Sequence, residues 1–170
     1  MPATARPRSP RPLYTPAERA RRDATRWTLV QGVLAPLQFL VFGVSLALVL
    51  RALATGEHET LAAWSVIVKT AVLCLIMVTG AIWEKVVFGR WLFAPAFFWE
   101  DVVSVGVIAL HGLYVWMYLT GTGTPATQFG IALAAYAAYL VNAAQFLWKL
   151  RAARLGAASA RAGVPRAQPA

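Results

Sequence analysis

Residues 102–148 contain no Asp, Glu, Lys or Arg, and this uncharged stretch limits the possible folds more than any other feature. A helix needs about 20 apolar residues to cross the hydrocarbon of a bilayer, so the stretch is too long for one crossing. Gly121-Thr-Gly-Thr-Pro125 interrupts it, and glycine and proline commonly end helices. We therefore predict two membrane spans here, at about 100–119 and 127–149.

Two further spans are predicted earlier in the chain. Residues 27–50 carry no charge, and residues 60–83 carry only Lys69, which predicts spans at about 28–52 and 60–84. The chain is 14% charged, whereas a soluble domain carries about 25% charged residues. The predicted fold class is all-α and integral to the membrane: a four-transmembrane-helix bundle that occupies residues 27–150.

The distribution of charge predicts the orientation of the spans. The net charge is +9, and arginines are concentrated before the first span and after the last. Positive charge beside membrane spans marks the cytoplasmic side, so we expect both termini there, with an aromatic-rich cytoplasmic hairpin between the second and third spans. Residues 1–26 and 151–170 are predicted to be basic, largely disordered tails. Within the first tail, Thr15-Pro16-Ala17-Glu18 has the pattern of a helix cap and first turn.

The composition argues against several classes of function. The basic residues lack the interleaved aromatics that stack on bases, so we expect no nucleic-acid partner. Cys74 is the only cysteine, and the sequence has no Cys/His metal motif. Bis-histidine haem ligation is not expected, because His111 is the only histidine in a span and His58 lies in a loop. Lys69 and Glu84 would also suit a proton-coupled transporter, but a chain of only four short spans argues against that class of protein.

Three of the seven acidic residues, Glu84, Glu100 and Asp101, fall where the second and third spans should meet the membrane surface. Acids are costly at a bilayer and mark functional sites there. Burial favours the protonated carboxylic acid, which can then donate a proton near neutral pH. We predict that these three residues are catalytic. The simpler alternatives are helix N-capping for Glu100 and Asp101, and pairing of Glu84 with Lys85 or Arg90.

Polar side chains from the first and last spans are expected at the same depth as the acids. Gln31 and Gln38 share one helix face, and Asn142 and Gln145 share another. Interhelical hydrogen bonding, at ~0.6 kcal/mol per contact, would explain the amides alone. Such hydrogen bonding would not explain the three acids at the same depth. Because the amides share that depth with the acids, we predict that they bind substrate.

Lys69 and His111 form a second candidate pair, in the other half of the bilayer. At about 1.5 Å per residue, both lie at a similar distance from the shared ends of their antiparallel spans. The simpler alternatives are that Lys69 extends toward water and that His111 hydrogen-bonds a neighbouring carbonyl. Phe98 and Trp99 belong to the aromatics near residues 88–99, which predict either an interfacial belt or a flat platform for a flat ligand.

Four runs of the sequence resemble one known family. They are WTLVQGVLAPLQFLVF (27–42), MVTGAIWEKVVFG (77–89), LFAPAFFWEDVVS (92–104) and AAYAAYLVNAAQFLWKLRAARL (134–155). These runs are similar to the 3-vinyl bacteriochlorophyllide hydratases of anoxygenic phototrophs. The resemblance implies addition of water across the C3 vinyl group of a magnesium chlorin, chlorophyllide a or 3-vinyl bacteriochlorophyllide, on the route to bacteriochlorophyll a. It also implies a place in the bacterial inner (intracytoplasmic, photosynthetic) membrane.

The implied reaction suits the predicted acids. Water adds to the carbon next to the ring, so the terminal CH2 must be protonated, which needs a general acid and a base. We expect Glu84 or Glu100 to donate that proton and another carboxylate to deprotonate water, while the carboxylates stabilise the intermediate cation. We expect no cofactor and no metal of the protein's own. His111 is the candidate axial ligand for the substrate's magnesium.

A non-enzymatic pigment-binding or assembly protein of the same pathway is the main alternative function. It would use the aromatics and His111 but not the acids, and a quinone-binding electron carrier is a further alternative. The expected partners are the magnesium chlorin and the lipid bilayer, and the sequence leaves open whether other enzymes of the pathway or a second copy of the chain also bind. Conversion of vinyl to hydroxyethyl chlorin by purified protein separates the enzyme from the carrier.

Overall fold

A computed structural model of the chain describes residues 13–162, with side chains through residue 155. Its regular secondary structure is all helical and comprises α1 (Pro16–Ala24), α2 (Arg26–Thr55), α3 (Glu59–Phe88), α4 (Phe98–Thr120) and α5 (Pro125–Ala162). The four helices α2 to α5 are each long and apolar enough to cross a membrane. The predicted all-helical, four-span class is therefore confirmed, and each helix extends beyond its predicted bounds.

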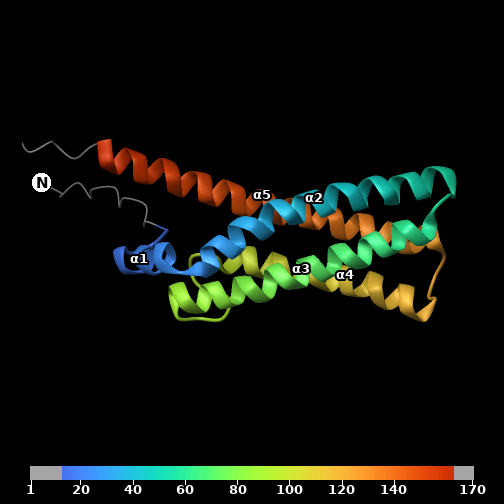
Figure 1. The fold of residues 1–170 in the computed structure, drawn as a ribbon, viewed down its shortest axis with the longest axis horizontal. Coiled ribbons are helices and arrows are strands. Elements are labelled where there is room, and N and C mark those ends of the chain that lie inside the picture. Colours follow the sequence, from blue (N-terminus) through green and yellow to red (C-terminus); the bar gives the residue numbers. More distant parts are fainter. Residues whose placement is uncertain (1–12, 163–170) are drawn as a thin grey trace, which may run out of the picture.

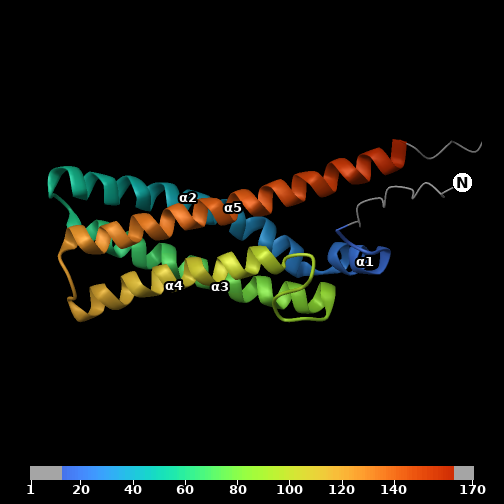
Figure 2. The same ribbon diagram turned by 180° about the vertical axis from the view of Figure 1, so that it is seen from behind.

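The long helices form two antiparallel hairpins. α2 packs along α3, and α4 packs along α5 (Figure 1). The hairpins meet less extensively, mainly where α3 contacts α4 and where α2 crosses α5 (Figure 2). α1, the 89–97 connection and the C-terminal part of α5 lie at the same end of the bundle, which we call the α1 end.

Local sequence explains where the helices begin and end. α2, α3 and α4 each stop at a glycine with positive φ, namely Gly56, Gly89 and Gly121, which glycine adopts without a Cβ clash. α1 begins with a capping box: Thr15 Oγ1 accepts a hydrogen bond from the Glu18 backbone N–H, and the Glu18 carboxylate accepts one from the Thr15 N–H. The predicted cap at Thr15 is confirmed.

Hydroxyl and amide contacts fix how α2 lies against α3. Ser45 Oγ is 2.7 Å from Ser65 Oγ, and Gln31 Nε2 donates to Thr79 Oγ1 at 2.8 Å. Both pairs fit one antiparallel register, in which Gln38 faces the middle of α3. Around them the core is closely packed by small and β-branched residues, as is common between membrane helices. Fully buried examples are Val49, Ala62, Val66 and Ala132.

Many large apolar side chains lie on the outer surface of the bundle. Leu29, Leu40, Leu119 and Leu147 are among the exposed ones. Soluble monomers rarely expose so much contiguous apolar surface, whereas lipid tails solvate it. α5 has 38 residues, so it is about 57 Å long, and it carries helix into the predicted C-terminal tail as far as Ala162.

Candidate active site at the α1 end

The three predicted acids converge at the α1 end of the bundle. Glu84 lies in the last turns of α3, and Glu100 and Asp101 lie in the first turn of α4. Their exposed fractions are 5%, 6% and 3%, so all three are buried. Antiparallel packing of consecutive helices brings them to one level, as depth counting in the sequence predicts.

Glu84 and Asp101 form a pair. Their carboxyl groups lie close enough to interact electrostatically. Glu84 Oε2 also accepts from the Ala94 N–H at 3.2 Å, and Asp101 Oδ2 accepts from the Phe93 N–H at 2.8 Å. Phe93 has a φ of 58°, and a left-handed residue of this kind can turn successive N–H groups toward one anionic site. The pair therefore holds the connection between α3 and α4 in place.

These contacts bear on the alternative roles for the acids. The N-cap position of α4 is Phe97, and it receives no side-chain hydrogen bond, so Asp101 does not cap the helix. Its place in the first turn still suits the positive end of the helix dipole. Glu84 is not tied to Lys85, whose Nζ donates to the Gly89 carbonyl at 3.1 Å.

Glu100 has a different partner, which the sequence did not single out. Lys149 of α5 forms an ion pair with the Glu100 carboxylate and donates to the Ala96 carbonyl oxygen. One signal was available, because Asn142, Gln145 and Lys149 recur three and four residues apart and so share one face of α5. Lys149 therefore links α5 to both the first turn of α4 and the connection before it.

The predicted amides differ in their contacts. Asn142 Nδ2 donates to the Glu100 backbone carbonyl at 2.9 Å and lies 3.1 Å from Ser104 Oγ. Gln31 is bonded to α3 as described above. By contrast, Gln38 is 2% exposed and neither polar atom of its side chain has a hydrogen-bond partner, and Gln145 Oε1 also lacks one.

An aromatic cluster closes the α1 end beside the acids. It contains Tyr14, Trp83, Phe88, Phe97 and Phe146. Phe98 and Trp99, for which the sequence allows either an interfacial belt or a platform that binds substrate, lie outside this cluster and are 43% and 68% exposed. Tyr14 was not singled out, because its place in the cluster depends on how α1 folds back over α3.

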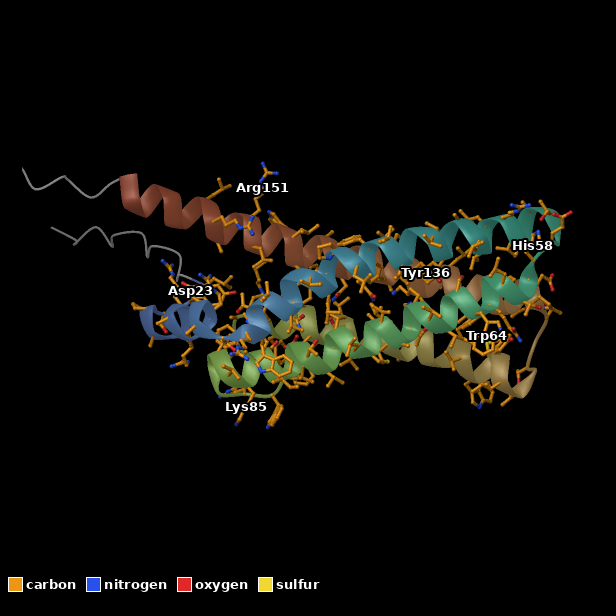
Figure 3. All side chains as sticks on the ribbon, viewed as in Figure 1. Asp23, His58, Trp64, Lys85, Tyr136 and Arg151 are labelled. Atoms are coloured by element: carbon orange, nitrogen blue, oxygen red, sulfur yellow. The ribbon has the colours of Figure 1, made fainter. Side chains whose placement is uncertain are left out.

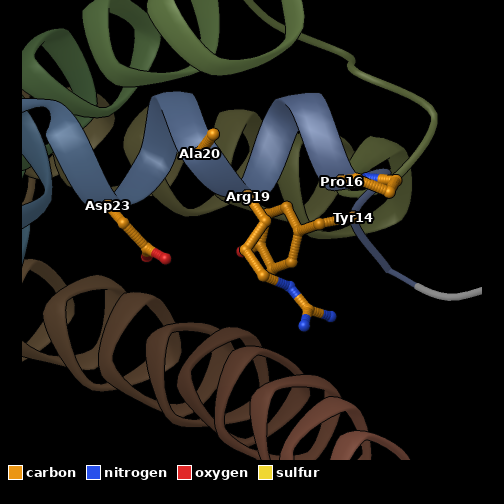
Figure 4. Close-up of a pocket in the computed structure, with 5 residues that line it drawn as sticks. All are labelled: Tyr14, Pro16, Arg19, Ala20 and Asp23. Carbon is orange, nitrogen blue, oxygen red and sulfur yellow. The ribbon is translucent and has the colours of Figure 1, made fainter.

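α1 is fastened to the bundle by few contacts. Tyr14 stacks on Phe88 with ring centroids 5.8 Å apart and planes at 11°, and Arg21 Nε donates to the Val87 carbonyl at 2.8 Å. Burial raises the pKa of Tyr14, which stays a neutral phenol at physiological pH. Beside this contact is an open surface hollow lined by Tyr14, Pro16, Arg19, Ala20 and Asp23 (Figure 4).

Lys69 and His111 lie in the half of the bundle away from the α1 end, at the depth of the labelled Tyr136 in Figure 3. Both are fully buried, and the two side chains interact electrostatically, so they form the facing pair considered from the sequence. Lys69 does not extend to water. His111 Nδ1 lies 2.8 Å from the Val107 carbonyl oxygen, which is the neighbouring-carbonyl contact also considered. Within residues 13–162 no three His, Cys, Asp or Glu side chains are grouped so as to hold a metal ion.

The fold and this site define a multi-pass helical membrane protein with buried carboxyl groups at one end of its bundle. The family described as 2-vinyl bacteriochlorophyllide hydratase matches residues 14–152. A protein of that name from Cereibacter sphaeroides is 69% identical over 145 residues, which cover 85% of this chain and 90% of the relative. One from Rhodobacter capsulatus is 64% identical over 163 residues, which cover 96% and 95%. No solved structure matches the chain.

The chain belongs to the 2-vinyl bacteriochlorophyllide hydratase family. It is therefore an enzyme of the hydro-lyase class, and the resemblance found in its sequence is confirmed. The family name numbers as position 2 the vinyl group that is numbered 3 in the family that the sequence resembles.

Proposed function

We propose that this protein hydrates the vinyl group of chlorophyllide a or 3-vinyl bacteriochlorophyllide to the 3-(1-hydroxyethyl) product, in the photosynthetic inner membrane of a bacterium. The family match and the names of its two relatives support the reaction class. Arg21, Arg22, Arg151 and Arg154 support placing the α1 end in the cytoplasm. Addition of water to a vinyl group causes no net oxidation or reduction, so the reaction requires no redox cofactor.

The placement of the Glu84 and Asp101 carboxyl groups side by side, on the successive backbone N–H groups of Ala94 and Phe93, is the observation that carries the mechanism. Two negative charges this close strongly disfavour each other, so the pair holds one proton. The protonated carboxyl is then a general acid, and its ionised partner is a base beside it. One pair thus supplies both groups that hydration of an alkene needs.

The proposed reaction has two steps. The carboxyl proton passes to the terminal CH2, the π electrons of the vinyl group form the new C–H bond, and a cation remains on the carbon next to the ring. Water oxygen then bonds to that carbon, and the second carboxylate accepts the proton that water releases. The pair ends with one proton, as it began, and water is the only co-substrate consumed.

Glu100 has a different role in this proposal. It is ion-paired with Lys149 and lies beside the pair, where its carboxylate stabilises the cation that forms between the two steps. Asn142 holds the first turn of α4 through the Glu100 carbonyl, which keeps the acids in register. Gln145, with an unpaired buried oxygen, is placed to bind water or a polar substituent of the ring.

Amide substitutions test the carboxyl pair. Glu84→Gln and Asp101→Asn keep the shape of each side chain but remove the exchangeable proton, so turnover of vinyl to hydroxyethyl pigment should fall by about 10²-fold or more. The measurement is product formation by purified protein, followed by chromatography. Glu57→Gln, an exposed acid at the opposite end of the bundle, is the matched control and should keep the wild-type rate. Full turnover by both pair variants would show that the carboxyl mechanism is wrong.

A further inference from the structure

The interior of the bundle holds buried polar atoms that no step above uses. Lys69 Nζ, His111 Nε2, Tyr114 Oη and both side-chain polar atoms of Gln38 are buried without hydrogen-bond partners. Leaving such a group unpaired costs on the order of 1–3 kcal/mol. Ionisable residues inside a membrane usually serve a function, and here Lys69 of α3 and His111 of α4 lie around Tyr136 of α5 in one cluster. The cluster is therefore a candidate ligand site.

The hydrogen bonding of His111 fixes what its free nitrogen can do. Nδ1 lies 2.8 Å from the Val107 carbonyl oxygen, and a carbonyl can only accept, so Nδ1 carries the proton. Nε2 consequently presents a lone pair, and it has no partner. A histidine whose other N–H is held by a backbone carbonyl is the usual arrangement of a metal ligand.

Lys69 supplies the opposite kind of group. Its Nζ lies 4.0 Å from the centroid of the Tyr139 ring and 5.7 Å from that of Tyr136, but it donates no hydrogen bond. A ligand that satisfies both residues must offer an electrophilic centre to His111 and an oxygen acceptor to Lys69. A magnesium chlorin offers both, through its metal and through the oxygens of its keto and carboxylate substituents.

Depth along α4 relates this cluster to the acid site. Asp101 and His111 are ten residues apart, which is about 15 Å along the helix. Side chains on α4 tilt toward its N-terminus, so His111 leans toward the acids. This separation runs along the bundle, which is the direction in which a macrocycle held at His111 would extend toward the acids. Gln38, with its unpaired amide, faces the middle of α3 between the two levels.

The packing between the hairpins offers a lateral route for a flat ligand. α2 and α5 meet around their crossing, where Phe42 and Phe39 contact Tyr139 with ring centroids 5.1 and 5.8 Å apart. Phe39 is 38% exposed on the apolar outer surface, while Tyr139 is buried next to Lys69. Parting of these rings would connect the lipid phase with the cluster.

We propose that His111 Nε2 is the axial ligand of the substrate's magnesium, and that Lys69 donates a hydrogen bond to an oxygen on the edge of the pigment away from the vinyl group. The macrocycle then stands along the bundle, with its vinyl group at Glu84 and Asp101. This inference rests on the proposed function, because it assigns a pose to that substrate.

Absorption spectra of the full-length protein in lipid nanodiscs test the ligand. Addition of the magnesium vinyl chlorin should give a band shift typical of axial imidazole, and the metal-free chlorin should give none. His111→Leu should abolish the shift and weaken binding of the magnesium pigment by about tenfold or more, while leaving the affinity for the metal-free pigment unchanged. His111→Gly with added imidazole should regain the shift, and its recovery shows that the variant is folded.

The Lys69→Met variant tests the proposed hydrogen bond from Lys69 independently of His111. It should weaken binding of magnesium and metal-free pigments alike and should retain the band shift, because the lysine acts at the rim and not at the metal. If the wild type binds both pigments equally, and His111→Leu leaves the spectrum unchanged, the inference is overturned and the cluster holds internal water only.

Turnover separates this inference from the proposed mechanism. A Glu84→Gln protein that keeps the His111-dependent shift but loses turnover supports both. If Glu84→Gln and Asp101→Asn keep full turnover, the carboxyl mechanism fails while the band shift still decides the role of His111.

Discussion

At the scale of single residues, the three acids are distinguished by their partners. Glu84 and Asp101 face each other and hold successive backbone N–H groups, whereas Glu100 is matched by an ammonium. The same residue types in one short stretch of sequence therefore have different surroundings. The roles proposed for the three acids follow from these partners and not from residue type.

The Lys149–Glu100 ion pair should be strongly coupled. Lys149→Met leaves a carboxylate that is 6% exposed without its partner, so the free energy of unfolding should fall by on the order of 2–3 kcal/mol. Adding Glu100→Gln to that variant should restore most of the loss, because no buried charge then remains unpaired. Thermal unfolding of the two single variants and the double variant gives the coupling. Additive losses would mean that the pair is not formed.

Phe93 should tolerate glycine better than a β-branched residue. Its φ of 58° costs a residue with a Cβ about 1–2 kcal/mol, and branching at Cβ makes that conformation harder still. Phe93→Gly and Phe93→Val both remove the ring, so their difference isolates the backbone. The valine variant should have the lower melting temperature. Equal melting temperatures would show that the left-handed turn is not needed.

At the scale of elements, α1 is a short amphipathic helix that lies over the aromatic cluster. It has no buried residues of its own and is fastened by the preceding Tyr14 and by the Arg21–Val87 hydrogen bond. Such an element depends on its docking contacts, since an isolated nine-residue helix is marginal in water.

Tyr14→Ala should release α1 from the bundle. The variant loses the stacking on Phe88 and the contact with Phe97, so trypsin should cut at Arg19 to Arg22 several times faster than in the wild type. Tyr14→Phe keeps the ring and should be cut at the wild-type rate. Equal rates for all three proteins would place the docking energy elsewhere.

Acid should loosen the start of α1. Hydrogen bonding from Thr15 lowers the pKa of Glu18, so the ionised carboxylate stabilises the folded helix. That stability is present above the unfolded pKa of about 4.3 and is lost as pH falls through the lower folded value. Proteolysis by an acid-active protease should therefore accelerate below about pH 4 in the wild type. Glu18→Gln should show no such step, and an identical step would assign it to another group.

At the scale of the whole molecule, the topology is open to a direct test. In a Cys74→Ser background, single cysteines at Arg19→Cys and Glu57→Cys lie at opposite ends of the bundle. If the α1 end is cytoplasmic, an impermeant thiol reagent should label position 57 in intact spheroplasts and position 19 only in inverted vesicles. Labelling of both from one side would contradict the four-span arrangement.

The sequence was sufficient for the spans and for the depth of their polar residues. Length without charge defines a membrane helix, and antiparallel neighbours share their ends, so Glu84 and Asp101 could be placed at one level. It was insufficient for the rotation of each helix about its axis, which depends on packing along its whole length. The bonding of Glu84 and Asp101 to neighbouring backbone N–H groups and the Lys149–Glu100 pair follow from that rotation. The end of α5 was missed because an Ala-rich polar segment has high helix propensity without any membrane signal.

α5 has a mechanical consequence beyond its role as a span. At 38 residues and about 57 Å it is roughly twice as long as the hydrocarbon is thick, and it is continuous. The helix packs against α2 at their crossing, and Lys149 connects it to the 96–100 segment through Ala96 and Glu100. A displacement of the protruding end of α5 would therefore reach the segment that leads into the first turn of α4, where Glu100 and Asp101 lie.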